Sequence, residues 1–131
     1  MNRSIKKLGD AELEIMRVLW ESEEPVTSGY VLEKLKGKRD WKLSTLMTTL
    51  SRLGSKGFVN CDRTTRTNYY TPIISELDYK GIASKNLFEK LYGNSIKNMV
   101  ASLYDSHSIG DNDLKELRSL IDELEKEHRD G

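Results

Sequence analysis

The stretch Trp41–Val59, WKLSTLMTTLSRLGSKGFV, most constrains what this chain can fold into. Apolar residues recur in it at helical spacing as Leu46, Leu50 and Leu53, which predicts a short amphipathic helix with a narrow buried stripe. Gly57 is expected to end the helix, because glycine adopts the left-handed conformation in which many helices terminate. A short apolar strand then follows at once.

The other face of this predicted helix is small, polar and basic. It carries Ser44, Thr45, Met47, Thr48, Ser51, Arg52 and Ser55. Residues 44–56 contain no Asp or Glu, whereas a helix that is merely solvated usually mixes acids with its cations. A basic face without carboxylates is typical of a helix that approaches a polyanion closely, and DNA is the simplest such partner.

The charge of the chain is distributed unevenly although its formal net charge is zero. Residues 1–73 contain 13 Lys and Arg against 9 Asp and Glu, whereas residues 74–131 contain 8 against 12. Between residues 36 and 66, eight basic residues face two acids. This split indicates a basic binding half and an acidic, solvated half.

The first 73 residues predict a winged helix-turn-helix domain. The expected elements are helices at 10–21, 28–36 and 44–55, followed by strands at 58–62 and 68–73. The apolar side of the first helix is predicted as Leu13, Met16, Val18, Leu19 and Trp20. A third helix that follows the second by a tight turn is the helix-turn-helix arrangement, and the hairpin behind it is the wing.

The tip of the predicted hairpin, TTRT, is polar and is flanked by Arg63 and holds Arg66. On a wing, these arginines would lie over phosphates or enter an adjacent minor groove. The alternative is a solvated loop that happens to be basic.

Residues 74–131 predict a second domain of three amphipathic helices, at 75–92, 95–104 and 111–127. Helices of this kind do not enclose a core alone, so a second copy of the chain is the simplest partner for their apolar stripes. The predicted dimer interface comprises Ile82, Leu87, Leu91, Ile96, Met99, Val100, Leu103, Leu114, Leu117, Ile121 and Leu124. The fold class is therefore mainly α with one small hairpin.

Other chemistries find little support in the sequence. Cys61 is the only cysteine, and with His107 and His128 it has no metal-ligand spacing, so we expect no metal, no cofactor and no enzymatic activity. No apolar run is long enough to span a membrane, and a cytoplasmic protein is expected. The basic residues 1–7 are expected to form a frayed tail.

Several segments together resemble the BlaI/MecI/CopY family of penicillinase and methicillin-resistance repressors. The resemblance rests on LGDAELEIMRVLW, on DWKLSTLMTTLSRLGSKGFV and on NYYTP, and it covers nearly the whole chain. It implies a homodimeric winged-helix repressor in which Thr45 and Met47 face base edges and Arg52 lies near phosphates. It also implies operators with TACA/TGTA half-sites.

The chain departs from the family pattern at three places. The family often has Ser-Pro-Lys where residues 42–44 read Lys-Leu-Ser, and a basic residue at the position of Met47. Its antibiotic-responsive members are cleaved at an Asn-Phe bond, whereas the aligned pair here is Ser102–Leu103. This pair is the candidate cleavage site for a membrane sensor protease. Because it is not Asn-Phe, the sequence argues against induction by proteolysis. The C-terminal cysteine cluster of copper-responsive members is missing.

We therefore predict a dimeric transcriptional repressor of a pseudo-palindromic operator, with a β-lactam-resistance operon as one candidate. Its partners would be double-stranded operator DNA and a second copy of itself. The predicted DNA contacts are Lys42, Ser44, Thr45, Met47, Thr48, Ser51, Arg52, Lys56, Arg63 and Arg66. The alternative is a winged-helix protein–protein interaction module that does not bind DNA sequence-specifically.

Overall fold

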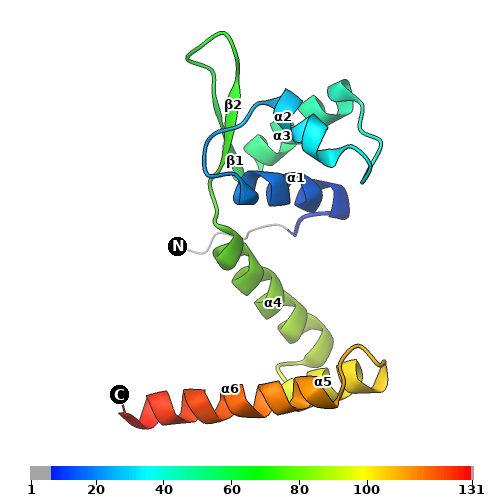
Figure 1. Cartoon of the computed structure of the whole chain (residues 1–131), viewed down its shortest axis with the longest axis vertical. Coiled ribbons are helices and arrows are strands. Elements are labelled where there is room, and N and C mark those ends of the chain that lie inside the picture. The colour runs from blue at the N-terminus through cyan, green and yellow to red at the C-terminus, as the bar shows by residue number, and fades with distance from the viewer. Residues whose placement is uncertain (1–6, 131) are drawn as a thin grey trace. The chain divides into compact units, whose positions relative to one another are not determined.

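The computed structural model describes residues 7–130 of the 131-residue chain (Figure 1). Its internal contacts form two compact units, Met1–Ser84 and Lys85–Gly131, which are described separately below as the N-terminal and C-terminal units. Of the basic tail at residues 1–7, only Lys7 lies within the described residues, so the expected fraying of residues 1–6 lies outside them.

Three helices make up most of the N-terminal unit, and their bounds agree with the predicted ones to within one residue. They are α1 (Asp10–Glu21), α2 (Ser28–Leu35) and α3 (Leu43–Ser55). Gly9 begins α1 and donates its amide to Glu12 Oε1 at 3.0 Å, while Thr27 Oγ1 accepts from the Tyr30 amide at 3.1 Å to begin α2. Gly57, with φ at +86°, turns the chain away after α3.

A two-stranded antiparallel sheet follows α3. Strands β1 (Val59–Asp62) and β2 (Tyr69–Pro72) pair so that Cys61 lies opposite Tyr70, and their hairpin projects beyond the helices of this unit (Figure 1). The sequence did not predict that Val26 would join the sheet. Its amide donates to the Tyr70 carbonyl at 3.1 Å and its carbonyl accepts from the Tyr70 amide at 2.7 Å. This bridge ties strand β2 to the loop between α1 and α2.

One apolar core holds the N-terminal unit together. Its fully buried side chains include Ile15, Met16, Leu19, Val31, Leu35, Leu46, Leu50, Leu53 and Phe58. The predicted apolar side of the first helix was wrong in omitting Ile15, which is 0% exposed, whereas Trp20 is only half-buried. The reason is that α1 contacts α2, α3 and β2 together, so it is covered over a wider arc than one narrow stripe. The predicted fold class, mainly α with a winged helix and a small hairpin, is confirmed.

Tyr79 brings the beginning of α4 (Glu76–Tyr92) into this core. The side chain is 7% exposed, and its hydroxyl accepts the Leu8 amide at 3.0 Å. Its ring lies 5.9 Å from that of Trp20 and meets that of Phe58 edge-on at 6.0 Å. The first turns of α4 are thus part of the N-terminal core.

The border between the two compact units lies inside α4. The sequence placed the boundary after residue 73, at the end of the second strand, whereas the contacts of the N-terminal unit continue to Ser84 inside α4. The indole nitrogen of Trp20 also donates to the Ile74 carbonyl at 2.9 Å, which holds the connection itself. A helix that spans two units gives no composition signal at their border.

The C-terminal unit contains the remainder of α4, then α5 (Ile96–Asp105) and α6 (Asp111–Asp130). Gly93 and Asn94, with φ values of +53° and +66°, end α4 in a left-handed turn. Ser95 Oγ then accepts the Asn98 amide at 3.1 Å and begins α5. Helix α6 extends three residues beyond its predicted end at residue 127.

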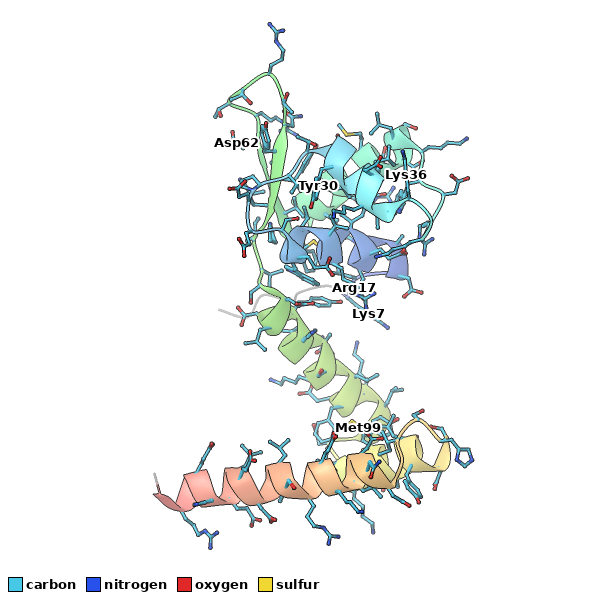
Figure 2. The ribbon with its side chains drawn as sticks, in the orientation of Figure 1. Lys7, Arg17, Tyr30, Lys36, Asp62 and Met99 are labelled. Atoms are coloured by element: carbon cyan, nitrogen blue, oxygen red, sulfur yellow. The ribbon has the colours of Figure 1, made fainter. Side chains whose placement is uncertain are left out.

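No side chain between residues 85 and 129 is buried. Met99 on α5 is among the half-buried ones (Figure 2). The most exposed large apolar side chains of this unit are Leu87, Leu91, Ile96, Tyr104, Leu120, Ile121 and Leu124, at 42–67%. No helix of the described part of the chain is long and apolar enough to cross a membrane.

Candidate nucleic-acid interface

The outward face of α3 is set by its buried stripe. Leu46, Leu50 and Leu53 are at most 1% exposed, so the opposite arc must point to solvent. The exposed residues on and beside this arc are Lys42, Ser44, Thr45, Met47, Thr48, Ser51, Arg52 and Ser55, as predicted. Thr49 is the one polar side chain turned inward, and its hydroxyl donates to the Thr45 carbonyl at 2.9 Å.

The hydroxyl groups on this face differ in what they can still bind. Thr48 Oγ1 donates to the Ser44 carbonyl at 3.0 Å, so its proton is used by the helix backbone. Within the described residues, the hydroxyls of Ser44, Thr45 and Ser51 make no hydrogen bond. Met47 adds an apolar group that is 37% exposed. Free hydroxyls beside one apolar side chain suit the polar edges and methyl groups of a DNA major groove.

Five cations on and around α3 and the hairpin make no ion pair within residues 7–130. They are Lys38, Lys42, Arg52, Arg63 and Arg66. Helix α3 itself carries no acidic residue. Because these five side chains are exposed and make no ion pair, their charges remain available for phosphates.

The hairpin tip is held in shape by its own side chains. Asp62, at the end of β1 (Figure 2), accepts from both the amide and the hydroxyl of Thr64, at 2.9 and 2.7 Å. These two hydrogen bonds keep the pKa of the Asp62 carboxyl below its ordinary value. The tip thereby presents Arg63 and Arg66 to solvent from a turn fixed by hydrogen bonds, as a wing requires.

Lys56 differs from the other predicted DNA contacts because it makes an ion pair. Its ammonium is 2.8 Å from Glu12 Oε2 on α1, and its side chain is only 25% exposed. The structure therefore places the charge of Lys56 against α1, one helical turn beyond Arg52. Sequence reasoning missed this pair because the two residues are 44 positions apart.

Glu12 is engaged through both of its carboxylate oxygens, one with Lys56 and the other with the Gly9 amide. Burial by itself would raise the pKa of the Glu12 carboxyl. The hydrogen bonds from Lys56 and Gly9 outweigh it, with help from the charges of Lys56 and Arg52, and the pKa is lowered below its ordinary value. Glu12 is thus held as a carboxylate at neutral pH.

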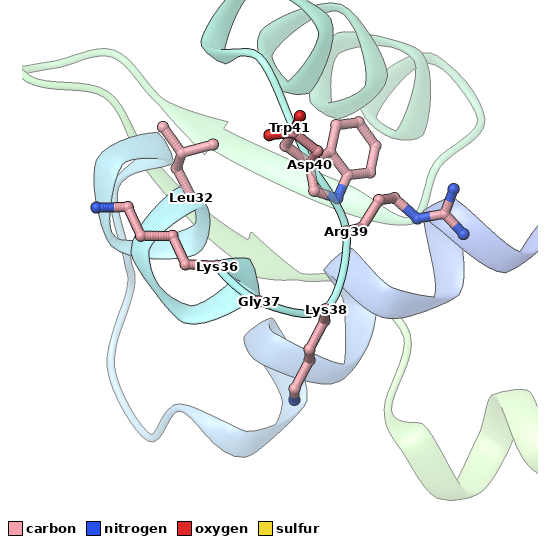
Figure 3. Close-up of a pocket in the computed structure, with 7 residues that line it drawn as sticks. All are labelled: Leu32, Lys36, Gly37, Lys38, Arg39, Asp40 and Trp41. Atoms are coloured by element: carbon pink, nitrogen blue, oxygen red, sulfur yellow. The ribbon is translucent and has the colours of Figure 1, made fainter.

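A pocket of about 460 Å³ lies at the turn between α2 and α3 (Figure 3). It is lined by Leu32, Lys36, Gly37, Lys38, Arg39, Asp40 and Trp41. Figure 3 shows the cationic ends of Lys36, Lys38 and Arg39 pointing in three different directions, away from one another. The Trp41 indole nitrogen is buried and has no hydrogen-bond partner. Because the cations do not converge, this hollow does not form an anion site.

The residues predicted for the dimer interface fall on α4, α5 and α6. Most are half-buried, and Leu87, Leu91, Ile96, Ile121 and Leu124 are exposed. The candidate cleavage pair Ser102–Leu103 lies within α5, where Ser102 is exposed and Leu103 is half-buried. A protease needs extended backbone, so cleavage there would require this helix to open locally.

Metal-ligating side chains do not gather anywhere in the described residues. No group of three or more His, Cys, Asp or Glu within them is arranged to hold a metal ion. Cys61 is half-buried in β1, opposite Tyr70. Burial raises the pKa of the Tyr70 hydroxyl, and the neighbouring Cys61 raises it further.

Comparisons with known proteins give a consistent picture. The family model described as "Penicillinase repressor" matches residues 8–123. The penicillinase repressor of Bacillus licheniformis is 29% identical over 121 residues, covering 92% of this chain and 94% of that protein. The methicillin resistance regulatory protein MecI of Mammaliicoccus sciuri is 25% identical, covering 92% and 98%. The solution structure of the DNA-binding domain of the repressor BlaI matches with a TM-score of 0.51 and 36% identity, over 60% of this chain and 94% of that domain.

Proposed function

This chain belongs to the penicillinase repressor family, and from that premise we propose that it is a dimeric transcriptional repressor of a pseudo-palindromic operator. The observation that carries the proposal is the outward face of α3. It combines free hydroxyls, an exposed methionine and unpaired cations with the complete absence of carboxylates. Relatives named as repressors over nearly the whole chain support the same function.

Each protomer would lay α3 in the major groove. Thr45 and Met47 are the proposed base contacts, and the exposed Lys42 and Arg52 are the proposed contacts to the phosphates that flank the groove. Ser44, Thr48 and Ser51 complete the polar surface of the helix. The hairpin tip would set Arg63 and Arg66 over the neighbouring backbone, which fixes the register of α3 without reading sequence.

The C-terminal unit would join two such protomers. Its exposed apolar stripes need a covering surface, and a second copy supplies one by two-fold symmetry. A symmetric dimer in turn requires two half-sites about one helical turn apart, or a multiple of it. Derepression must then lower either the affinity for the operator or that of one protomer for the other. We place the protein in the cytoplasm, beside the DNA, and assign it no catalytic activity.

Fluorescence anisotropy with labelled duplexes tests the proposal. Duplexes with TACA–N–TGTA palindromes, the half-sites that the family resemblance implies, are compared with scrambled duplexes at several salt concentrations. Tight binding that depends on the palindrome supports the repressor. Binding to both duplexes alike supports a DNA-binding protein with another operator. Absence of salt-dependent binding to either duplex contradicts the proposal and favours a protein-interaction module.

The five unpaired cations on and around α3 and the hairpin give an expected salt dependence. Five per protomer, each neutralising one phosphate, correspond to a slope of log affinity against log salt of roughly −9 for a dimer. Arg52→Ala should weaken palindromic and scrambled duplexes alike and flatten the slope by about one unit per protomer. Arg118→Ala removes an equal charge from exposed α6 and should leave the slope unchanged. Equal effects of the two variants would contradict a phosphate contact at Arg52.

A further inference from the structure

Two acidic side chains of α1 hold the chain on either side of α3. Glu14 Oε2 lies 2.7 Å from Arg39 Nε in the turn that leads into α3, and Glu12 Oε2 lies 2.8 Å from Lys56 Nζ directly after it. The two ion pairs thus connect α1 to both ends of the helix that faces outward. No pair of this kind was predicted from the sequence.

These two pairs differ from the other ion pairs of the described residues. Lys36–Glu33 and Lys80–Glu76 each join residues three or four positions apart, and their side chains are 47–70% exposed, so they contribute little to stability or geometry. The side chains of Glu12 and Lys56, by contrast, are 14% and 25% exposed. Those of Glu14 and Arg39 are 21% and 44% exposed, and each of the two pairs joins separate elements. An ion pair partly shielded from solvent restrains the elements that it joins more firmly than an exposed one.

Glu12 is the more tightly fixed of the two acids. Its Oε1 accepts the Gly9 amide at 3.0 Å, so the carboxylate is locked to the first turn of α1 before it meets Lys56. Helix α1 is itself immobilised by Ile15, Met16 and Leu19 in the core. The ammonium of Lys56 is therefore held toward α1, and its charge is neutralised there.

Resting on the proposed repressor function, we propose that Glu12 is a positioning and specificity-determining residue, supported by Glu14 at the other end of α3. It fixes the angle of α3 against α1, and it keeps the Lys56 cation away from DNA. A freed lysine at this position would neutralise a phosphate on any sequence and would raise non-specific affinity most. By holding Lys56, Glu12 leaves recognition to the outward face of α3.

The decisive variant is Lys56→Met, compared with Arg52→Met in the full-length protein. Affinities for a palindromic and a scrambled duplex are measured by anisotropy across a salt series. If Lys56 binds Glu12 and does not contact a phosphate, Lys56→Met leaves the salt slope unchanged. The ratio of palindromic to scrambled affinity falls, because the restraint on α3 is lost. Arg52→Met flattens the slope by about one unit per protomer. A slope flattened equally by both variants would show Lys56 on phosphate and overturn the inference.

Glu12→Gln is the complementary variant. The glutamine amide oxygen still accepts the Gly9 amide, so the start of α1 is retained while the charge that binds Lys56 is removed. The scrambled duplex should then bind more tightly, and the slope of its log affinity against log salt should become steeper by about one unit per protomer. The ratio of palindromic to scrambled affinity, which measures discrimination, should fall roughly fivefold. Adding Lys56→Met to this variant should return the slope to that of the original protein.

Glu33→Gln is the matched control, because it removes the same charge from an exposed pair that restrains nothing beyond α2. Discrimination that falls equally in Glu12→Gln and Glu33→Gln would mean that net charge alone is responsible and would overturn the inference. Palindrome-dependent binding by the original protein with unchanged discrimination in Glu12→Gln also overturns it, and leaves the repressor function standing. No DNA binding by the original protein refutes both proposals together.

Discussion

The two units of this chain differ in whether they bury their apolar side chains. Among the described residues, all fifteen buried hydrophobic side chains belong to the N-terminal unit, from Leu8 to Tyr79. In the C-terminal unit no side chain between residues 85 and 129 is buried, although its helices carry as regular an apolar stripe. Both units are amphipathic, so amphipathic sequence alone does not decide whether a core closes.

The difference is one of geometry. In the N-terminal unit α1 meets α2, α3 and the hairpin, so each apolar stripe finds a partner within the same chain. In the C-terminal unit three helices expose leucines and isoleucines such as Leu91 and Ile121. Burying one Leu or Ile stabilises a protein by about 1.5–3 kcal/mol. Covering several of these side chains with a second copy would therefore supply the stabilising free energy that this unit does not gain from its own core.

Leu117→Asp provides the strongest test of this comparison. Leu117 is a half-buried residue of the α6 stripe, and its replacement places a charge in the proposed interface twice per dimer. The expected loss is about 2–5 kcal/mol per copy, enough to give a monomer at micromolar concentration. Sedimentation equilibrium measures the molecular mass directly, and operator affinity should fall with it.

Ser119→Asp is the control for that variant. Ser119 is exposed on the opposite side of the same helix, so it adds the same charge without touching the stripe. The Ser119→Asp protein should remain a dimer. An intact dimer in both variants would show that the proposed interface is misplaced.

Fragments that end at different residues test where the N-terminal unit stops. A fragment of residues 1–84 keeps Tyr79 against Trp20 and Phe58, whereas a fragment of residues 1–73 loses it. Removing a buried aromatic side chain should cost about 3–5 kcal/mol of unfolding free energy. Urea denaturation followed by circular dichroism compares them, and equal stability would favour the boundary predicted from sequence.

Ile15→Ala tests the N-terminal core alone. Ile15 is 0% exposed, so its truncation should lower the free energy of unfolding by about 2–5 kcal/mol. Since the residue lies far along the chain from the proposed interface, the variant should unfold at lower temperature and remain dimeric below that temperature. A change of oligomeric state without loss of thermal stability would contradict the separation of roles between the units.

Met47→Ala should have the smallest effect and the most selective one. Met47 makes no charged contact, and as a proposed base contact it should alter discrimination at one base pair by about 1–3 kcal/mol. Selection from a randomised duplex library compares the preferred half-sites before and after the change. The salt slope and the dimer should be unaffected, and an unchanged preference would show that Met47 does not face a base.

Most of the candidate interface could be predicted from the sequence because it depends on one helix. Once Leu46, Leu50 and Leu53 are assigned to the core, the rise and rotation of an α-helix place Ser44, Thr45 and the other exposed residues. Lys56 was grouped with them by charge alone. Only the fold shows that Lys56 is paired with Glu12, because a pair of residues 44 positions apart leaves no periodic signal in the sequence.

The sequence by itself determined the elements of this protein and their limits. The helix starts predicted at residues 10, 28, 44 and 95 agree with the structure to within one residue, and Gly57 has the predicted left-handed conformation. These features depend on neighbouring residues, so local chemistry was sufficient to find them. The tertiary structure alone decided that Ile15 is fully covered, that Val26 joins the sheet, that Tyr79 completes the N-terminal core and that Lys56 faces α1. Each of these depends on segments distant in the chain meeting in space, and their meeting is fixed by how whole faces pack together.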